Sequence, residues 1–262
     1  MINNIASSEI GGIRKNWLIW WTLGNQDIKL KYRRSTLGPF WITLSTAISI
    51  YSMGFLYGHL FKANLTLYFP HLAAGIIGWA CIASLLEESG SVFIESESYI
   101  TNQESMLSMF IMRMLLRNLI IFCHNLAAFI PIALIFKTGL SLKMLMIFPG
   151  LMIIGINTLF WGTILGLIAT RYRDFQQILS SILRVMFFLT PIMWMPSLLP
   201  SQYQWIALYN PLNQFLNLIR SPMLNESISS LNLIIVMLIT ALGFVLYNIT
   251  LRKHKHKLVF WI

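Results

Sequence analysis

The chain has 262 residues, of which 56% are hydrophobic and 11% are charged, and its mean hydropathy is +0.68. Soluble domains carry about 25% charged residues, so the composition excludes an ordinary soluble protein and predicts an integral membrane protein. The formal net charge of +10 then indicates contact with an anionic inner leaflet rather than with nucleic acid.

The chain begins with a cation-rich segment. Only a short apolar run, WLIWWTL at 17–23, lies within it, and no small-residue cleavage site follows that run. Such a run is too short for a cleavable signal peptide, so the first long apolar run is expected to direct insertion. Four cations stand directly before that long run: Lys29, Lys31, Arg33 and Arg34.

Runs without Asp, Glu, Lys or Arg indicate the membrane-crossing segments. Six such runs contain 19 or more residues, and about 20 apolar residues cross the hydrocarbon as a helix. We therefore expect an all-α membrane protein with six spans, the first opened by Pro39, where a missing N–H costs little. The expected spans are residues 38–61, 69–91, 116–136, 144–170, 176–196 and 230–251.

The stretch between the fifth and sixth spans has an unusual composition. The charge-free run 185–219 is too long for one crossing and contains four of the nine prolines, which interrupt helices. Residues 197–222 are therefore expected to form short helices that lie in the interface or dip back into the membrane.

The Lys and Arg residues beside the spans predict the orientation. Fourteen flank the spans on one side and four flank them on the other, namely Lys62, Lys137, Lys143 and Arg220. Cytoplasmic flanks carry the cation excess. Both termini are therefore expected in the cytoplasm, as an even number of spans requires.

The chain lacks the residue patterns of several enzyme classes. No Gly-Lys dipeptide, and hence no phosphate-binding P-loop, is present. The five histidines, nine acids and two cysteines show no metal-ligand or acid-base spacing. Apart from Arg117 at the edge of the third span, Arg184 is the only Lys or Arg inside a predicted span, and it either lines a pathway or closes a structural ion pair.

An acidic and apolar segment follows the second span. It is either a solvated helical loop or a docking surface, on which apolar side chains anchor a partner and carboxylates orient it. The docking candidates are Phe93, Ile94, Glu95, Glu97, Tyr99 and Asn102.

Aromatic residues make up 13% of the chain. Most are expected to face lipid or to form interfacial belts. The alternative is a lining for an amphipathic solute, because a flat ring offers an apolar face to sugar C–H groups while Tyr and Trp add a polar edge. The candidates for this lining are Trp41, Tyr51, Phe55, Phe187, Phe188 and Trp194.

Several short motifs follow one another along nearly the whole chain. Together and in this order they resemble the membrane subunits of ABC-2-type polysaccharide exporters, above all the O-antigen (lipopolysaccharide) permeases, with capsule and teichoic-acid permeases as relatives. The motifs are DIK at 27–29, YRRS at 32–35, LGPFW at 37–41, YITN at 99–102, RYRDF at 171–175, TPIMW at 190–194 and YNPLNQF at 209–215.

The resemblance implies one ABC-2-type transmembrane domain over residues 1–262, in a bacterial inner membrane. It implies a homodimer that is driven by two copies of a separate P-loop ATPase, which binds ATP and Mg²⁺ while this chain carries no cofactor and is not an enzyme. The implied cargo is an undecaprenyl-diphosphate-linked glycan of lipopolysaccharide biosynthesis, which passes through a channel between the two permeases.

The resemblance also assigns parts to three segments. Residues 16–36 are expected to form an interface helix, 93–106 to hold the coupling helix seated in the ATPase, and 197–222 to form periplasmic gate helices. The interface segment is not a clean amphipath, because apolar residues lie on both of its sides, and Gly24 with Asn25 is a candidate break in the helix.

The four cations of the basic stretch have two interpretations. They either hold the N-terminus in the cytoplasm and do nothing else, or they attract the lipid diphosphate to the channel entrance, where each contributes on the order of 1 kcal/mol. In the second case Arg184 is expected to meet the diphosphate as it enters.

Two other functions compete with glycan export. One is an ABC-2 permease for another cargo, such as capsule, teichoic acid, a lipid or a drug. The other is a membrane-embedded glycosyltransferase or acyltransferase, which needs acids or a His-Asp pair near the membrane surface, and this chain offers few.

Overall fold

A computed structural model describes residues 5–38, 40–60, 62–102, 106–136, 138 and 141–262, so Pro39 lies outside the described part. All regular elements in these ranges are helical, which confirms the all-α class. The α-helices are α1 (Ile5–Lys15), α2 (Trp17–Tyr32), α3 (Phe40–Leu60), α4 (Leu65–Ser89), α5 (Glu97–Asn102), α6 (Leu107–Ala127), α7 (Phe129–Ile135), α8 (Ile147–Asn157), α9 (Thr163–Arg171), α10 (Phe175–Leu189), α11 (Trp205–Tyr209), α12 (Pro211–Met223) and α13 (Ser230–His254).

Short turns of other helix types join several of these elements. A π turn at Thr158–Gly162 continues α8 into α9. Tighter 3₁₀ turns lie at Leu142–Met146, Pro196–Leu198, Ser201–Tyr203 and Lys255–Phe260.

Five helical segments within the described ranges are long and apolar enough to cross a membrane, which confirms the multi-pass membrane class. The third begins at Leu107 rather than at the expected residue 116, because two arginines taken as flanking charges lie inside α6. The five segments are Phe40–Leu60, Leu65–Ser89, Leu107–Ile135, Leu142–Arg171 and Ser230–Phe260.

The predicted fifth span, residues 176–196, is a continuous helix only as far as Leu189. Helix α10 has 15 residues and is about 22 Å long, less than the ~30 Å of a bilayer core. It ends where Thr190, which precedes Pro191, adopts an extended conformation (φ −85°, ψ 135°), as residues before proline prefer. The described part of the chain therefore contains five long apolar segments and one short apolar helix.

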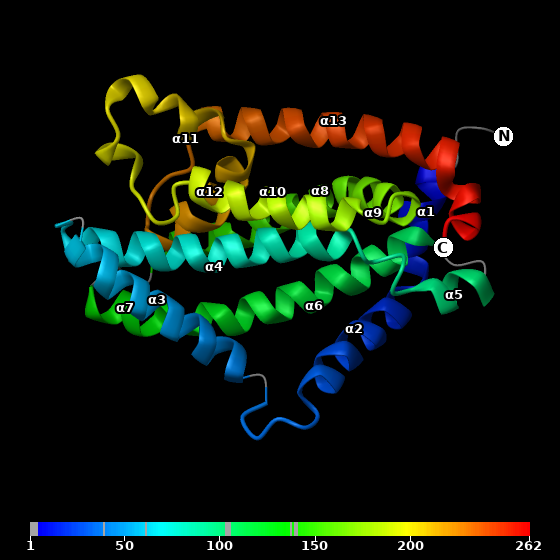
Figure 1. Cartoon of the computed structure of the whole chain (residues 1–262), viewed down its shortest axis with the longest axis horizontal. Helices are drawn as coiled ribbons and strands as arrows, with labels where there is room; N and C mark the ends of the chain where they lie inside the picture. Colours follow the sequence, from blue (N-terminus) through cyan, green and yellow to red (C-terminus); the bar gives the residue numbers. More distant parts are fainter. Residues whose placement is uncertain (1–4, 39, 61, 103–105, 137, 139–140) are drawn as a thin grey trace.

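Helix α4 is the centre of the bundle (Figure 1). In its most apolar stretch 72% of the residues are buried, against 17% for α3 and α13. Helices α3, α6, α10 and α12 all pack against α4. The helices α3 and α13 therefore leave most of their apolar surface open to lipid or to a partner.

The two ends of the bundle differ in what they contain. Helices α1 and α5 and the C-terminal end of α13 lie at one end, and α7 and α11 lie at the other (Figure 1). Glu9 of α1 is fully buried at the first end, where its carboxylate lies 2.6 Å from Lys255 Nζ and accepts a hydrogen bond from the Ser108 backbone N–H at 3.0 Å. This contact ties α1 to the start of α6 and to the C-terminal turn.

Short helices occupy the stretch predicted between the last two spans. The 3₁₀ turns at 196–198 and 201–203 are followed by α11 and α12. Helix α12 is buried along most of its length and packs against α4, α8 and α13. Helix α12 therefore fills the interior of the bundle at one end.

Candidate functional site

Helix α2 lies against α6 through a glycine. A Cβ on Gly24 would stand 3.0 Å from Leu116 Cδ2 and 3.2 Å from the Arg113 carbonyl oxygen, both on α6, so glycine allows the two helices to approach closely. The predicted break at Gly24 and Asn25 is wrong, since α2 is continuous from Trp17 to Tyr32. The side chains of Trp17 and Trp21 remain half exposed, as expected for a helix between lipid and protein.

An ionic network fixes α2 to the bundle. Arg113 of α6 pairs with both carboxylate oxygens of Asp27, at 2.8 Å from Nε and 2.6 Å from Nη2. Arg117, one turn further along α6, reaches Asp27 at 3.4 Å and Glu88 of α4 at 2.8 Å, and Asn118 Nδ2 donates to the same Glu88 oxygen at 2.6 Å. The four charged side chains are 12% to 28% exposed, so the network that joins α2, α4 and α6 is largely shielded from solvent.

The basic stretch, defined as Lys29, Lys31, Arg33 and Arg34, has the opposite character. All four side chains are exposed, and within the described ranges no carboxylate forms an ion pair with any of them. The stretch leads into Gly38, whose φ of +54° is a conformation that glycine adopts without strain. This turn joins α2 to α3.

A hollow of about 330 Å³ lies beside the basic stretch. Lys31 and Tyr32 line it from α2, Trp41, Ile42 and Ser45 from α3, and Ile121 from α6. Partial burial raises the pKa of the Tyr32 hydroxyl above its usual value, so the phenol stays neutral and can donate a hydrogen bond. The Lys31 ammonium, the Tyr32 phenol and the Trp41 indole therefore surround a space at the start of α3.

The lining candidates occur on the two helices that flank α4. Phe55 on α3 and Phe188 on α10 are both 67% exposed. Tyr51 packs on Phe69 of α4 at 5.8 Å between ring centroids, and Phe187 meets Trp79 of α4 edge-on at 5.9 Å. We call the exposed side chains of α3 and α10 the aromatic face.

The remaining candidates of this set lie on the same two helices or directly after α10. Trp41 is 47% exposed at the start of α3, and Trp194 Nε1 donates to the Phe188 carbonyl at 3.0 Å. Arg184 of α10 is exposed, and its Nε donates to the Ser180 carbonyl at 3.2 Å. Among the described residues no acid lies within ion-pair distance of it.

The docking candidates surround the short helix α5. Glu95, Glu97 and Tyr99 are exposed and Ile94 is partly buried, whereas Phe93 is fully buried. The Phe93 ring lies over Gly166 of α9, where a Cβ would stand 2.8 Å from the ring. Phe93 thus holds the loop to the bundle and leaves Glu95, Glu97 and Tyr99 facing outward. The side chain of Asn102 and residues 103–105 lie outside the described part.

A buried arginine, which the sequence placed only among the flanking cations, joins two of the short motifs. Arg220 of α12 is 6% exposed. Its guanidinium donates to the Pro191 carbonyl of TPIMW and to the side-chain oxygens of Asn213 and Asn217, at 3.0 and 2.6 Å. Amide and carbonyl oxygens therefore bind this cation, with His71 Nε2 at 3.5 Å, whereas Arg113 is bound by the carboxylate of Asp27.

Asn210 completes this contact between the motifs. Its Oδ1 accepts hydrogen bonds from the backbone N–H groups of Leu212 and Asn213, which caps the start of α12. Its Nδ2 donates to Thr190 Oγ1 at 3.0 Å. The end of α10 and the start of α12 are thus fixed to each other. An Asn directly before a Pro, as in Asn210 and Pro211, is a helix-start signal that the sequence already contains.

Comparison with known proteins gives a consistent result. The sequence profile of a family described as ABC-2 type transporter matches residues 19–224. Two curated proteins of Klebsiella pneumoniae, both named O-antigen export system permease protein RfbA, are similar to this chain. One is 24% identical over 232 residues and the other 23% identical over 230 residues, and each alignment covers 86% of this chain and 88% of the relative.

Proposed function

Because the chain belongs to the ABC-2 type transporter family, we propose that it is the permease of an ATP-driven exporter of undecaprenyl-diphosphate-linked polysaccharide of the O-antigen type. The names of the two curated relatives, O-antigen export system permease, support this cargo class. The matched family consists of transporter membrane components, so this chain transports and does not catalyse.

Two copies of the chain form the channel in this proposal, and the aromatic face of each copy lines it. The mostly unburied surface of α3 and the exposed rings on α3 and α10 support that role, because flat rings bind sugar C–H faces without demanding one linkage. Helix α10, completed by the turn after Leu189, is the fifth of six crossings and the shortest. Residues 197–222 are the periplasmic gate helices, and both termini are cytoplasmic.

Two copies of a P-loop ATPase, which bind ATP and Mg²⁺, drive the channel from the bacterial cytoplasm. The outward-facing Glu95, Glu97 and Tyr99 form the docking surface. Phe93 supports this surface from beneath, because its ring is buried against Gly166.

The observation that carries the cargo assignment is the basic stretch beside the hollow at the start of α3. Cations that already have carboxylate partners cannot serve an anionic ligand without losing those partners. The basic stretch has no such partner among the described residues, and Lys31 and Tyr32 face the hollow. A diphosphate headgroup in the hollow accepts charge-assisted hydrogen bonds from these cations. The ionic network around Asp27 holds α2, and with it these cations, in place.

Reconstitution tests the proposal. The chain is co-purified with the proposed partner ATPase and placed in vesicles that contain a lipid-linked glycan, and ATP-dependent appearance of glycan in the opposite leaflet is measured. We expect transport that stops when the ATPase loses its P-loop lysine. A chain that binds no ATPase and turns over a lipid-linked sugar by itself would contradict the transporter assignment. Transport of a different cargo in preference to the glycan would contradict the cargo.

A further inference from the structure

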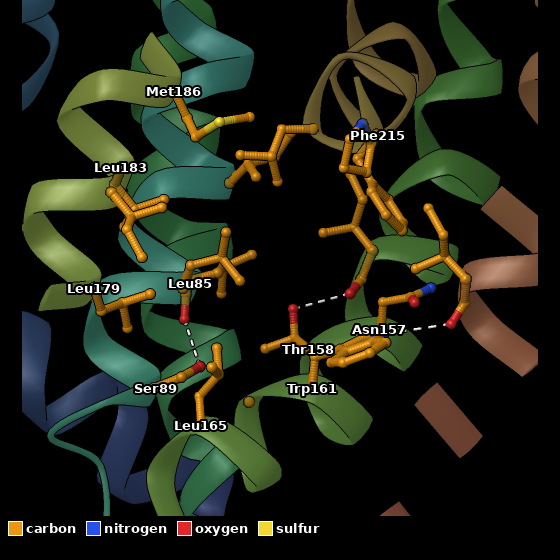
Figure 2. Close-up of a pocket in the computed structure, with 18 residues that line it drawn as sticks. Leu85, Ser89, Asn157, Thr158, Trp161, Leu165, Leu179, Leu183, Met186 and Phe215 are labelled. Carbon is orange, nitrogen blue, oxygen red and sulfur yellow. Dashed lines mark hydrogen bonds between the residues drawn. The ribbon is translucent and has the colours of Figure 1, made fainter. Parts of the chain in front are cut away.

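A second hollow, unrelated to the basic stretch, lies in the interior of the bundle. It has a volume of about 370 Å³, and helices α4, α8, α9, α10, α12 and α13 all contribute to its wall. Figure 2 shows Leu179, Leu183 and Met186 along α10 on one side, opposite Thr158 and Trp161. The wall comes from the middle parts of α10 and α13, so the cavity lies at the depth of the bilayer hydrocarbon.

The hydrogen-bond donors in the wall are used within the protein, whereas one acceptor, Asn157 Oδ1, is buried without a partner in the described part of the chain. Ser89 donates to the Leu85 carbonyl at 2.6 Å and Thr158 to the Ile154 carbonyl at 2.9 Å. Asn157 Nδ2 donates to Thr240 Oγ1 at 2.8 Å, and Trp161 Nε1 donates to the Ile239 carbonyl. With these donors occupied, the surface that faces the cavity is hydrocarbon. Neither water nor a sugar finds hydrogen-bond donors there.

A local change of helix type accompanies the cavity. The π turn at Thr158–Gly162 inserts an extra residue into the helix, and such turns are frequent at functional sites. Both Thr158 and Trp161, which line the cavity, belong to this turn. Protein interiors contain few voids larger than a water molecule, so a cavity of this volume is not an ordinary packing fault.

The size of the cavity restricts its occupant. A sphere of this volume is about 9 Å across, narrower than a helix with its side chains at about 10–12 Å, so a helix of a second copy does not fit. A 150 Å³ apolar cavity holds benzene, which scales to on the order of 12–15 carbon atoms here. One fatty-acyl chain matches that number, whereas an undecaprenyl chain is several times longer.

We propose that this cavity binds one acyl chain of a bilayer phospholipid. Ile182 lines the cavity and is also 51% exposed, so the wall reaches the surface of the bundle and an acyl chain can enter there from the side. The chain gains dispersion contacts with the apolar wall, which an empty cavity forfeits. An acyl chain between α10 and α13, next to Phe215 of α12, fills the space behind α10, one of the two helices that carry the aromatic face.

Photolabelling in a defined bilayer tests the site. The full chain is reconstituted in vesicles of phosphatidylethanolamine and phosphatidylglycerol, part of which carry a diazirine in the middle of one acyl chain, and labelled peptides are mapped after irradiation. We expect labels on the 154–165 and 179–186 segments. Leu183→Trp and Ile239→Trp, which fill the cavity from two different helices, should each lower these labels at least threefold.

The control is the residue next to Ile239. Leu238 is 65% exposed, so Leu238→Trp adds the same side chain outside the cavity and should leave the labels unchanged. The two filling variants are independent, so one that elutes unlike the wild type in size-exclusion chromatography is replaced by the other, and Leu183→Phe and Ile239→Phe provide milder versions.

Three results would overturn the proposal. They are equal labelling in the wild type and in both filling variants, loss of the labels when undecaprenyl phosphate is added in an amount equal to the probe, and cross-links between these segments and a second copy. The second result would assign the cavity to the carrier lipid, and the third would assign it to the dimer interface. None of these results depends on ATP or glycan, so glycan export can fail while the acyl-chain site stands.

Discussion

Asp27 and Lys31 lie one turn apart on α2, yet their surroundings differ. Two arginines of α6 enclose the Asp27 carboxylate, while Lys31 is exposed and lines an open hollow. Removing the arginine partners of Asp27 destabilises the protein, whereas Lys31 has no carboxylate partner to lose among the described residues. One half of the helix is therefore an anchor, and the other half is available to an external anion.

The largest effect is expected where the anchor is broken. Asp27→Ala leaves Arg113 and Arg117 partly buried without their shared carboxylate, and breaking such a pair costs about 3 kcal/mol. Thermal unfolding in detergent should show a clearly lowered midpoint. Glu97→Ala, which removes an exposed carboxylate from α5, is the matched control and should change the midpoint little.

A compensating variant sharpens this prediction. Asp27→Leu combined with Arg113→Met removes both charges of the bidentate pair, while Arg117 keeps its pairing with Glu88 at 2.8 Å, and apolar replacement of a whole buried ion pair is often neutral. A double variant as unstable as Asp27→Ala would show that the ion pair is not the source of the loss.

The next effect concerns the buried cation at the other end. Arg220→Met removes the donor of the Asn213 and Asn217 side-chain oxygens and one of the two groups that bind the Pro191 carbonyl, and a buried acceptor without a donor costs about 1–3 kcal/mol. The contact between the end of α10 and α12 should loosen, which limited proteolysis within residues 196–203 would detect. Arg252→Met, at an exposed position, should leave the cleavage pattern unchanged, and an unchanged pattern in Arg220→Met would contradict the account.

A smaller effect is expected in the free half of α2. Lys31→Gln removes about 1 kcal/mol of attraction for an anionic headgroup, or about a fivefold loss in apparent affinity for the lipid-linked glycan. The loss should shrink as salt screens the charge, and the unfolding midpoint should not move. Lys253→Gln removes another exposed cation and should leave the affinity unaltered. Equal losses in both variants would indicate bulk charge and not a site.

In the docking loop we expect a change in the rate of association rather than in stability. Glu97→Lys changes an exposed side chain and should shift stability by no more than about 0.5 kcal/mol. Association with the ATPase should slow, because charges at the edge of an interface act mainly on the rate of encounter. Stopped-flow binding at low and high salt measures this, and a salt-independent rate identical to the wild type would remove Glu97 from the docking surface.

Much of the fold followed from composition and charge-free runs. The membrane class and five long apolar segments agree with prediction, because the bilayer forces length and hydropathy on every crossing helix. The shortening of α10 was readable as well, since Thr190 precedes Pro191 and such residues leave the helical region.

The charge pairing of the site was not readable in the same way. Asp27 and Arg113 are 86 residues apart, and only the packing of α2 on α6 brings them together. Two arginines four residues apart on one helix face, Arg113 and Arg117, were a signal that an acid was to be sought. The sequence contains no signal for the cavity, because the cavity depends on how the side chains of six helices pack against one another.

Headgroup affinity in an uncharged bilayer tests the central claim, that an anchored helix presents free cations to the diphosphate of the cargo. The protein is placed in nanodiscs of phosphatidylcholine, and binding of undecaprenyl-diphosphate-linked glycan is compared between the wild type and a variant with all four residues of the basic stretch changed to Gln. Four cations at about 1 kcal/mol each, partly offset by mutual screening, predict at least a 30-fold weaker affinity in the variant. Equal affinities would contradict the claim, and would leave these cations the role of holding the N-terminus on its side of the membrane.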